Sequence, residues 1–291
     1  MSFDQLLSQP QPIITDGASG TLLASRGLSS GVPEVWNLTH PDMVSQVPAD
    51  YAAAGAQIIL TNTLGGSGIK LTKAGVDQHD EINRRAVELA RQGVGDRALV
   101  FVSMGSTGEL LGLTSTLTEA DVQATFEAQA KTVVEAGADG FVIETMTDLG
   151  EAKCALRAVR AVCGLPVVVS LTYDEGARGP ATMMGVRPEQ AAVDLTQAGA
   201  DMVGANCGNM SDEAWVRTIA TLAANADRPI WAKPNAGLPQ LVDGKPLFSM
   251  APAEFVQLGR KLVDAGAKAI GGCCGTTPRH IAALAAELNQ E

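Results

Sequence analysis

Eight short runs of apolar residues recur along the chain, and a segment of helix length follows each of them. The runs are continuous rather than alternating, which is typical of strands covered on both faces of a parallel sheet. The segments between them, such as 79–93 and 119–137, carry the amphipathic pattern of surface helices. We therefore expect strands at 12–15, 57–61, 98–104, 140–144, 166–172, 201–205, 229–233 and 268–272.

A faint internal repeat supports this alternation of strands and helices. Four times, an expected helix ends in Ala-Gly-Ala and a strand follows, which places Gly55, Gly137, Gly199 and Gly266 just past helix ends. Eight strand–helix units in 291 residues predict an α/β fold, a single (β/α)8 TIM barrel spanning residues 1–291 as one domain. An open doubly wound sheet is the alternative, but no Gly-x-Gly-x-x-Gly follows the first strand.

Composition and charge exclude several classes of protein. With 46% hydrophobic and 18% charged residues, the chain is typical of a globular protein with a large core. Its formal charge of −11 argues against nucleic acid as a partner. No apolar run is long enough to span a membrane, and the N-terminus does not resemble a signal peptide. Five cysteines without an export signal indicate reduced thiols and a cytoplasmic protein.

Polar residues follow the predicted strands, among them Asp16, Glu144, Asn235 and two sets of cysteines. In a barrel the carboxyl ends of all strands open onto one face, where the active site lies. Cys207 follows the sixth strand and the adjacent pair Cys273 and Cys274 follows the eighth, about 66 residues later. We expect these three residues, the cysteine triad, to meet at the mouth of the barrel.

Three converging thiols favour a metal site. A disulfide between neighbouring cysteines is a poor alternative, because consecutive Cα atoms lie about 3.8 Å apart and a relaxed disulfide needs about 4.4–6.8 Å. Zn²⁺ prefers sulfur and takes four ligands, so three thiolates leave one position open, as in catalytic sites. The glycines around the pair allow the bend that would turn both side chains to one side. The alternative is that Cys273 and Cys274 have no chemical role and are small residues that pack at a narrow end of the barrel. Cys154 and Cys163 fit ordinary packing.

The charge of such a site indicates its chemistry. Zinc with three thiolates carries about −1 overall, and a thiol entering the fourth position loses its proton at neutral pH. The bound sulfur stays electron-rich and can attack an electrophilic carbon. Three histidines would instead make a stronger Lewis acid that activates water. The residues alone therefore predict a zinc-activated thiol nucleophile.

The chain resembles the homocysteine S-methyltransferase family, which includes betaine–homocysteine and S-methylmethionine–homocysteine methyltransferases and the homocysteine-binding domain of cobalamin-dependent methionine synthase. The resemblance covers nearly the whole chain. It rests on "DGASGT" (16–21), "TNT" (61–63), "STGEL" (106–110), "ET" (144–145), "GANC" (204–207), "KPNAG" (233–237) and "GGCCGTTP" (271–278).

This resemblance implies a methyltransferase of methionine biosynthesis, with Zn²⁺ on the cysteine triad and homocysteine sulfur in the open position. Asp16 and Glu144 would accept hydrogen bonds from the substrate ammonium, and the backbone N–H groups of Gly17 and Ala18 would reach its carboxylate. Asn235 resembles a residue that fills the fourth zinc position when substrate is absent.

The methyl donor stays open at this point: betaine, a sulfonium compound or a separate methyl-corrinoid protein. Trp36 could stack on a cationic donor or simply pack, and Leu64 is expected at the mouth. Two other functions also stay open. Lys233 ends the seventh strand and could serve a Schiff-base aldolase. The triad could instead serve a non-catalytic barrel that binds zinc or thiols.

Overall fold

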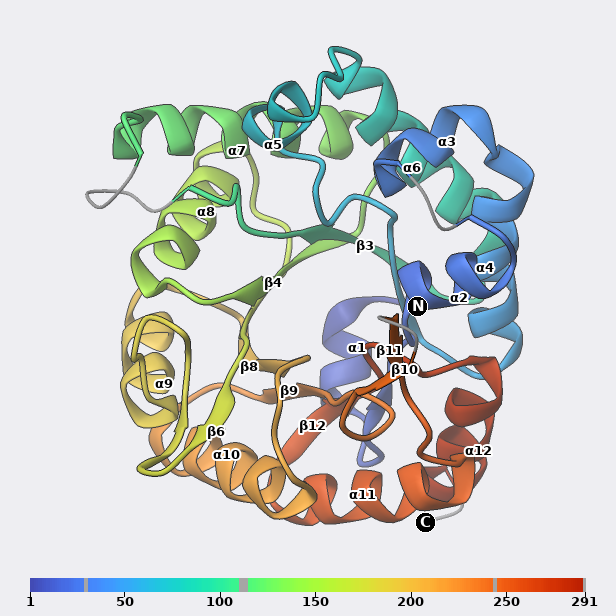
Figure 1. The fold of residues 1–291 in the computed structure, drawn as a ribbon, viewed down its shortest axis with the longest axis vertical. Helices are drawn as coiled ribbons and strands as arrows, with labels where there is room; N and C mark the ends of the chain where they lie inside the picture. Colours follow the sequence, from blue (N-terminus) through green and yellow to red (C-terminus); the bar gives the residue numbers. More distant parts are fainter. Residues whose placement is uncertain (29–30, 110–114, 243–244, 290–291) are drawn as a thin grey trace.

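The computed structural model describes residues 1–28, 31–109, 115–242 and 245–289. Eight parallel strands form a ring surrounded by helices, seen end-on in Figure 1, so the predicted (β/α)8 barrel is confirmed. All eight expected strands are present, because their apolar residues are buried between the barrel interior and the helices. They are β1 Ile13–Ile14, β2 Ile58–Leu60, β3 Leu99–Met104, β4 Gly140–Met146, β5 Val167–Leu171, β8 Met202–Asn206, β9 Ile230–Lys233 and β12 Ala267–Ile270.

The ring closes between its first two strands. The sheet order is β1-β12-β9-β8-β5-β4-β3-β2, with parallel pairing throughout. A parallel bridge joins Thr15 to Ile58, and the Gln57 N–H donates to the Ile14 carbonyl at 2.7 Å. All carboxyl ends therefore gather at one face, and β8, β9 and β12 lie side by side there.

Helices cover the outside of the ring. Gly55, Gly137, Gly199 and Gly266 have φ values of 98°, 89°, 92° and 109°, so the predicted helix ends are confirmed. The helices are α2 Ser19–Ser25, η1 Pro33–Val35, α3 Trp36–Thr39, α4 Pro41–Ala53, α5 Gly68–Lys73, α6 His79–Val94, α7 Glu119–Glu135, α8 Leu149–Val162, α9 Pro188–Gln197, α10 Asp212–Asn225, α11 Pro252–Asp264 and α12 Pro278–Leu288.

A short helix, α1 (Phe3–Ser8), closes the amino-terminal end of the barrel. Ser2 and Gln5 form a capping box at its start. Phe3 and Leu6 pack on the barrel interior, and the Phe3 and Phe101 ring centroids lie 5.5 Å apart. Helix α1 thus covers the amino-terminal end of the barrel, and the carboxyl face is the open end.

Two hairpins that the apolar pattern did not predict lie in loops at the carboxyl face. One follows β5 and consists of β6 (Asp174–Gly176) and β7 (Gly179–Ala181). The other follows β9 and consists of β10 (Gln240–Val242) and β11 (Lys245–Leu247). Within the described residues, no helix has the length and apolar character needed to cross a membrane.

Candidate metal centre and substrate cavity

The cysteine triad meets at the carboxyl face, as the strand ends led us to expect. The three Sγ atoms lie within 4.8 Å of one another, and those of Cys207 and Cys274 are 3.9 Å apart. In the part of the chain that the structure describes, no other set of three histidine, cysteine or acidic side chains converges in this way.

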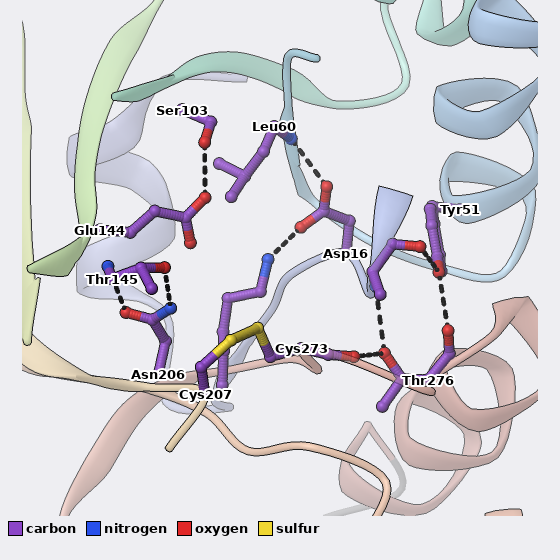
Figure 2. Close-up of polar contacts among 12 residues, drawn as sticks. Asp16, Tyr51, Leu60, Ser103, Glu144, Thr145, Asn206, Cys207, Cys273 and Thr276 are labelled. Atoms are coloured by element: carbon purple, nitrogen blue, oxygen red, sulfur yellow. Dashed lines mark hydrogen bonds and ion pairs between the residues drawn. A yellow bond between two sulfur atoms is a disulfide. The ribbon is translucent and has the colours of Figure 1, made fainter. Parts of the chain in front are cut away.

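Cys207 and Cys273 form a disulfide (Figure 2). Cys274 is free. This state differs from the reduced thiols expected from the sequence. The convergence of the two strand ends makes this pairing possible, because the two Cα atoms lie 5.5 Å apart, within the span of a disulfide.

The donor set also fits Zn²⁺ once the disulfide is reduced. Tetrahedral zinc with Zn–S bonds of about 2.3 Å requires sulfur–sulfur distances of about 3.8 Å. The separation of Cys207 and Cys274 already matches that requirement. Burial raises the pKa of the Cys274 thiol, and the nearby Glu144 carboxylate adds to the effect. A bound cation would offset both influences and favour the thiolate.

The end of β8 holds Cys207 in an uncommon backbone conformation, with φ at 56°. The neighbouring Asn206 side chain braces this turn against the end of β4 (Figure 2). Its Oδ1 accepts the Thr145 N–H at 2.9 Å and its Nδ2 donates to Thr145 Oγ1 at 2.8 Å. Gly208 follows with φ at 73°, and a Cβ there would lie 2.0 Å from the Tyr173 carbonyl oxygen. Only glycine fits this position without displacing the chain.

The loop after β12 turns Cys273 and Cys274 toward Cys207. Gly275 has φ at 79°, so it supplies the bend that the sequence predicted between glycines. Thr276 Oγ1 donates to the Cys273 carbonyl at 2.7 Å and accepts the Ala18 N–H at 3.1 Å. The Tyr51 hydroxyl lies 3.0 Å from the Ala18 carbonyl and 3.2 Å from that of Thr276. Tyr51 and Thr276 therefore tie this loop to the loop after β1, as Figure 2 shows.

A cavity of about 440 Å³ opens beside the triad. This volume suits a small-molecule site. All three cysteines border it, and its wall also includes Gly17, Ala18, Glu34, Leu64, Ser103, Glu144, Thr145 and Lys233. Leu64 is 40% exposed at the mouth, as expected for a residue that follows "TNT".

Glu144 is a buried carboxylate in the cavity wall. It accepts a hydrogen bond from Ser103 Oγ at 2.6 Å. Burial raises the pKa of Glu144, while the Lys233 ammonium and the Ser103 hydrogen bond act in the opposite direction. Such a carboxylate has a strong tendency to bind a hydrogen-bonding cation.

Asp16 lies behind the cavity rather than in its wall. It is fully buried, its Oδ2 accepts the Leu60 N–H at 2.8 Å, and its Oδ1 forms an ion pair with Lys233. Each oxygen has one partner and Asp16 does not border the cavity, so its expected direct contact with a substrate ammonium stays a prediction. The charged group that borders the cavity here is Lys233, which Asp16 holds through this ion pair.

A sequence profile described as homocysteine S-methyltransferase matches residues 13–288. The chain belongs to the homocysteine S-methyltransferase family. This confirms the family and the methyltransferase class predicted from the motifs. The chain is 30% identical to a methionine synthase of Mycobacterium tuberculosis and 30% identical to betaine–homocysteine S-methyltransferase 1 of Danio rerio, over 97% and 98% of its length. It spans about a quarter of the former relative (25%) and three quarters of the latter (75%).

Solved structures show the same fold. The oxidised form of the homocysteine methyltransferase MmuM from Escherichia coli superposes with a TM-score of 0.78 at 24% identity, and 97% of each chain is covered. Its metallated form gives a TM-score of 0.77 at 22% identity, covering 97% of this chain and 98% of that one.

Two further family positions, Gly17 and Ala18, lie in the cavity wall next to the triad loop. A Cβ at Gly17 would lie 2.7 Å from both the Tyr51 hydroxyl and Thr276 Oγ1, so the chain comes close there only because the side chain is absent. The Ala18 N–H already donates to Thr276, which leaves it occupied rather than free for a substrate carboxylate.

Asn235 borders a separate cavity of about 790 Å³ between α10 and α11. Its Nδ2 donates to the Gly208 carbonyl at 2.9 Å, directly after Cys207. Its Oδ1 is buried and has no hydrogen-bond partner. A buried acceptor without a donor beside the triad is compatible with the role expected for Asn235.

Other residues singled out from the sequence have structural places. Trp36 is 8% exposed within the main core and does not border the cavity, so packing rather than donor stacking is its observed role. Cys154 is fully buried and Cys163 packs against the same core, as expected. Asn206, Tyr51 and Thr276 were missed as positioning residues, although Asn206 directly precedes a triad cysteine.

Proposed function

We propose that the protein is a zinc-dependent homocysteine S-methyltransferase that makes methionine. The observation that carries this proposal is the convergence of three sulfurs on a cavity that also presents Glu144 and Lys233. Zn²⁺ held by the cysteine triad would lower the pKa of the incoming thiol, so that homocysteine is bound as a thiolate.

The remaining roles belong to the chain's own side chains. Glu144 accepts hydrogen bonds from the homocysteine ammonium, and the close backbone at Gly17 and Ala18 shapes the amino-acid end of the site. Asp16 acts through Lys233. In the transfer, the homocysteine sulfur forms a bond to the methyl carbon, and the donor keeps the electron pair of the bond that breaks. Asn235, whose buried Oδ1 has no hydrogen-bond partner, would supply a further ligand to the metal when homocysteine is absent.

The lining of the cavity favours some methyl donors over others. None of the described residues in its wall is aromatic, whereas recognition of a quaternary ammonium relies on aromatic faces. A carboxylate does line it: Glu34 accepts the Gly65 N–H with one oxygen, at 2.6 Å. We therefore rank a small sulfonium donor above betaine. A methyl-corrinoid protein, which would bring its methyl group to the open face, remains the second candidate.

The test combines metal analysis with a donor panel. Protein purified under reducing conditions should hold one zinc per chain and form methionine from homocysteine with S-methylmethionine, dimethylsulfoniopropionate, betaine or methylcobalamin as donor. The variant Cys274→Ala should lose the zinc and at least about 100-fold in activity, because even indirect supports of metal ligands are worth 10- to 100-fold. Its far-UV circular dichroism should match that of the wild type.

Cys163→Ala is the matched control, since Cys163 lies outside the triad and packs on the core. It should keep both zinc and activity. Methionine formation by Cys274→Ala at the wild-type rate would contradict the proposal. Stoichiometric zinc without methionine from any donor would favour the non-catalytic zinc-binding barrel instead.

A further inference from the structure

Lys233 is a buried cation whose hydrogen bonds are incomplete. The residue is 2% exposed, yet it borders the cavity beside the triad. An ammonium has three N–H donors, and among the described residues only Asp16 accepts from it. The centroid of the Trp231 ring lies 5.8 Å from Nζ. Buried charged groups are normally saturated with partners, so the cavity side of Lys233 is prepared for an anion.

Glu144 presents the opposite charge to the same cavity. Ser103 Oγ donates to its Oε1, and Lys233 is close enough to lower the pKa of the Glu144 carboxyl against the effect of burial. An α-amino acid carries an ammonium and a carboxylate on one carbon. A buried lysine and a buried glutamate in one small cavity therefore match the two charged groups of such a ligand.

The backbone near Gly17 and Ala18 has fewer free N–H donors for a substrate carboxylate than the "DGASGT" motif led us to expect. The Ala18 N–H is already used by Thr276 Oγ1 at 3.1 Å. Asp16 binds the Leu60 N–H with its second oxygen, and this contact fixes the carboxylate that holds Lys233 in place (Figure 2). The positive charge at the cavity wall is thus held in a fixed position before any ligand arrives, which favours tight recognition.

We propose that Lys233 binds the α-carboxylate of the thiol substrate while Glu144 binds its ammonium, so that this pair selects α-amino-acid thiols. The inference rests on the proposed function and adds a specificity-determining residue to it. Asp16 is then a positioning residue that acts through Lys233. The thiol of a substrate anchored at both charged groups extends toward the triad, which borders the same cavity.

The test measures binding rather than turnover, so it needs no methyl donor. Reduced, zinc-loaded protein is titrated by calorimetry with homocysteine, with 3-aminopropane-1-thiol, which lacks the carboxylate, and with 4-mercaptobutanoate, which lacks the amine. The wild type should bind each analogue about 10- to 100-fold more weakly than homocysteine, the value expected for a lost charged hydrogen bond. Lys233→Met should bind homocysteine as weakly as the carboxylate-free thiol, with the affinity for that thiol unchanged.

Three further variants complete the comparison. Lys233→Arg keeps the charge and should retain part of the preference for a carboxylate. Lys233→Gln repeats the comparison should the methionine variant fail to fold. Lys268→Met is the matched control, because Lys268 donates to the Gln9 and Gln11 carbonyls away from the cavity. It should leave all three affinities unchanged.

Two results would overturn the assignment of Lys233. One is an equal loss of affinity for homocysteine and the carboxylate-free thiol in Lys233→Met, which would indicate a purely structural lysine. The other is wild-type protein that binds both of these thiols equally well. Failure of wild-type protein to bind any thiol is a different outcome, since it would remove the proposed function together with this inference.

Discussion

Burying a charged side chain at this site lowers the stability of the fold but provides a group that can bind substrate, and Glu144 is an example. Its carboxylate is 8% exposed in a wall built largely of apolar atoms. Burial is the dominant influence on its pKa and raises it, so the charged form is less favourable in the folded protein than in the unfolded chain. A residue selected for stability alone would be neutral here.

Replacement of this carboxyl should therefore separate stability from binding. Because the folded-state pKa is raised, stability is lost as pH rises through it. We expect Glu144→Gln to have a higher Tm than wild type near neutral pH. The difference should vanish as pH falls below 4.5, the ordinary pKa of the group, since both side chains are then neutral. Homocysteine affinity should fall about 10- to 100-fold.

Thermal unfolding across pH, together with homocysteine titration, checks both parts. Glu213→Gln, at an exposed position on α10, is the control and should change neither quantity. A Glu144→Gln variant that is less stable than wild type at neutral pH would show that the carboxylate is a structural partner instead.

At the scale of elements, the end of β8 sets the position of the first triad cysteine. We expect Gly208→Ala to destabilise the protein by about 2–4 kcal/mol and to abolish zinc binding. The methyl group would enforce a strained left-handed residue and would also lie 2.0 Å from the Tyr173 carbonyl oxygen. Chemical denaturation and zinc analysis measure the two effects.

Gly75→Ala provides a control with almost the same backbone angle. Gly75 has φ at 75°, but a Cβ there has no neighbour within 4 Å. The free energy of unfolding of Gly75→Ala should therefore fall by only about 1 kcal/mol, the penalty of the left-handed conformation, and this variant should keep its zinc. Equal losses in the two variants would mean that the contact with Tyr173 is unimportant.

The elements themselves were predictable to different degrees. The eight strands followed from continuous apolar runs, because parallel strands such as β5 are buried on both faces. The hairpin β6–β7 escaped this reasoning, since β6 is exposed, β7 (Gly-Pro-Ala) is half-buried, and neither strand contains a run of large apolar residues. The Asp243-Gly244 dipeptide between β10 and β11 was a usable signal for the second hairpin that apolar periodicity overlooks.

For the whole molecule, topology explains which parts of the site could be foreseen. The triad was predictable because parallel strands deliver their carboxyl ends to one face, whatever their separation along the chain. The pair Asp16 and Lys233 was not foreseen as a pair, because the sequence places them 217 residues apart and does not say which strand-end charges face each other. The disulfide was not foreseen either, since three neighbouring thiols can bind a metal or pair with each other.

The barrel as a whole should remain folded when the metal is removed. The triad is positioned by Asn206, Tyr51 and Thr276 through hydrogen bonds that involve no metal, and the core is built from strands and helices far beyond it. Zinc at 100 times its Kd would stabilise the folded state by about 2.7 kcal/mol, which corresponds to roughly 5 °C in Tm for a chain of this size.

Chelation of reduced, zinc-loaded protein should therefore lower the Tm by about that amount and leave the far-UV circular dichroism at room temperature unchanged. Cys274→Ala should show the lower Tm with or without added zinc, because two thiols no longer hold the ion. Loss of helical signal on chelation would instead mean that the ion is part of the fold, as in small zinc domains. The hydrogen-bonded ring and the two apolar clusters argue for the first outcome, because neither cluster includes a cysteine of the triad.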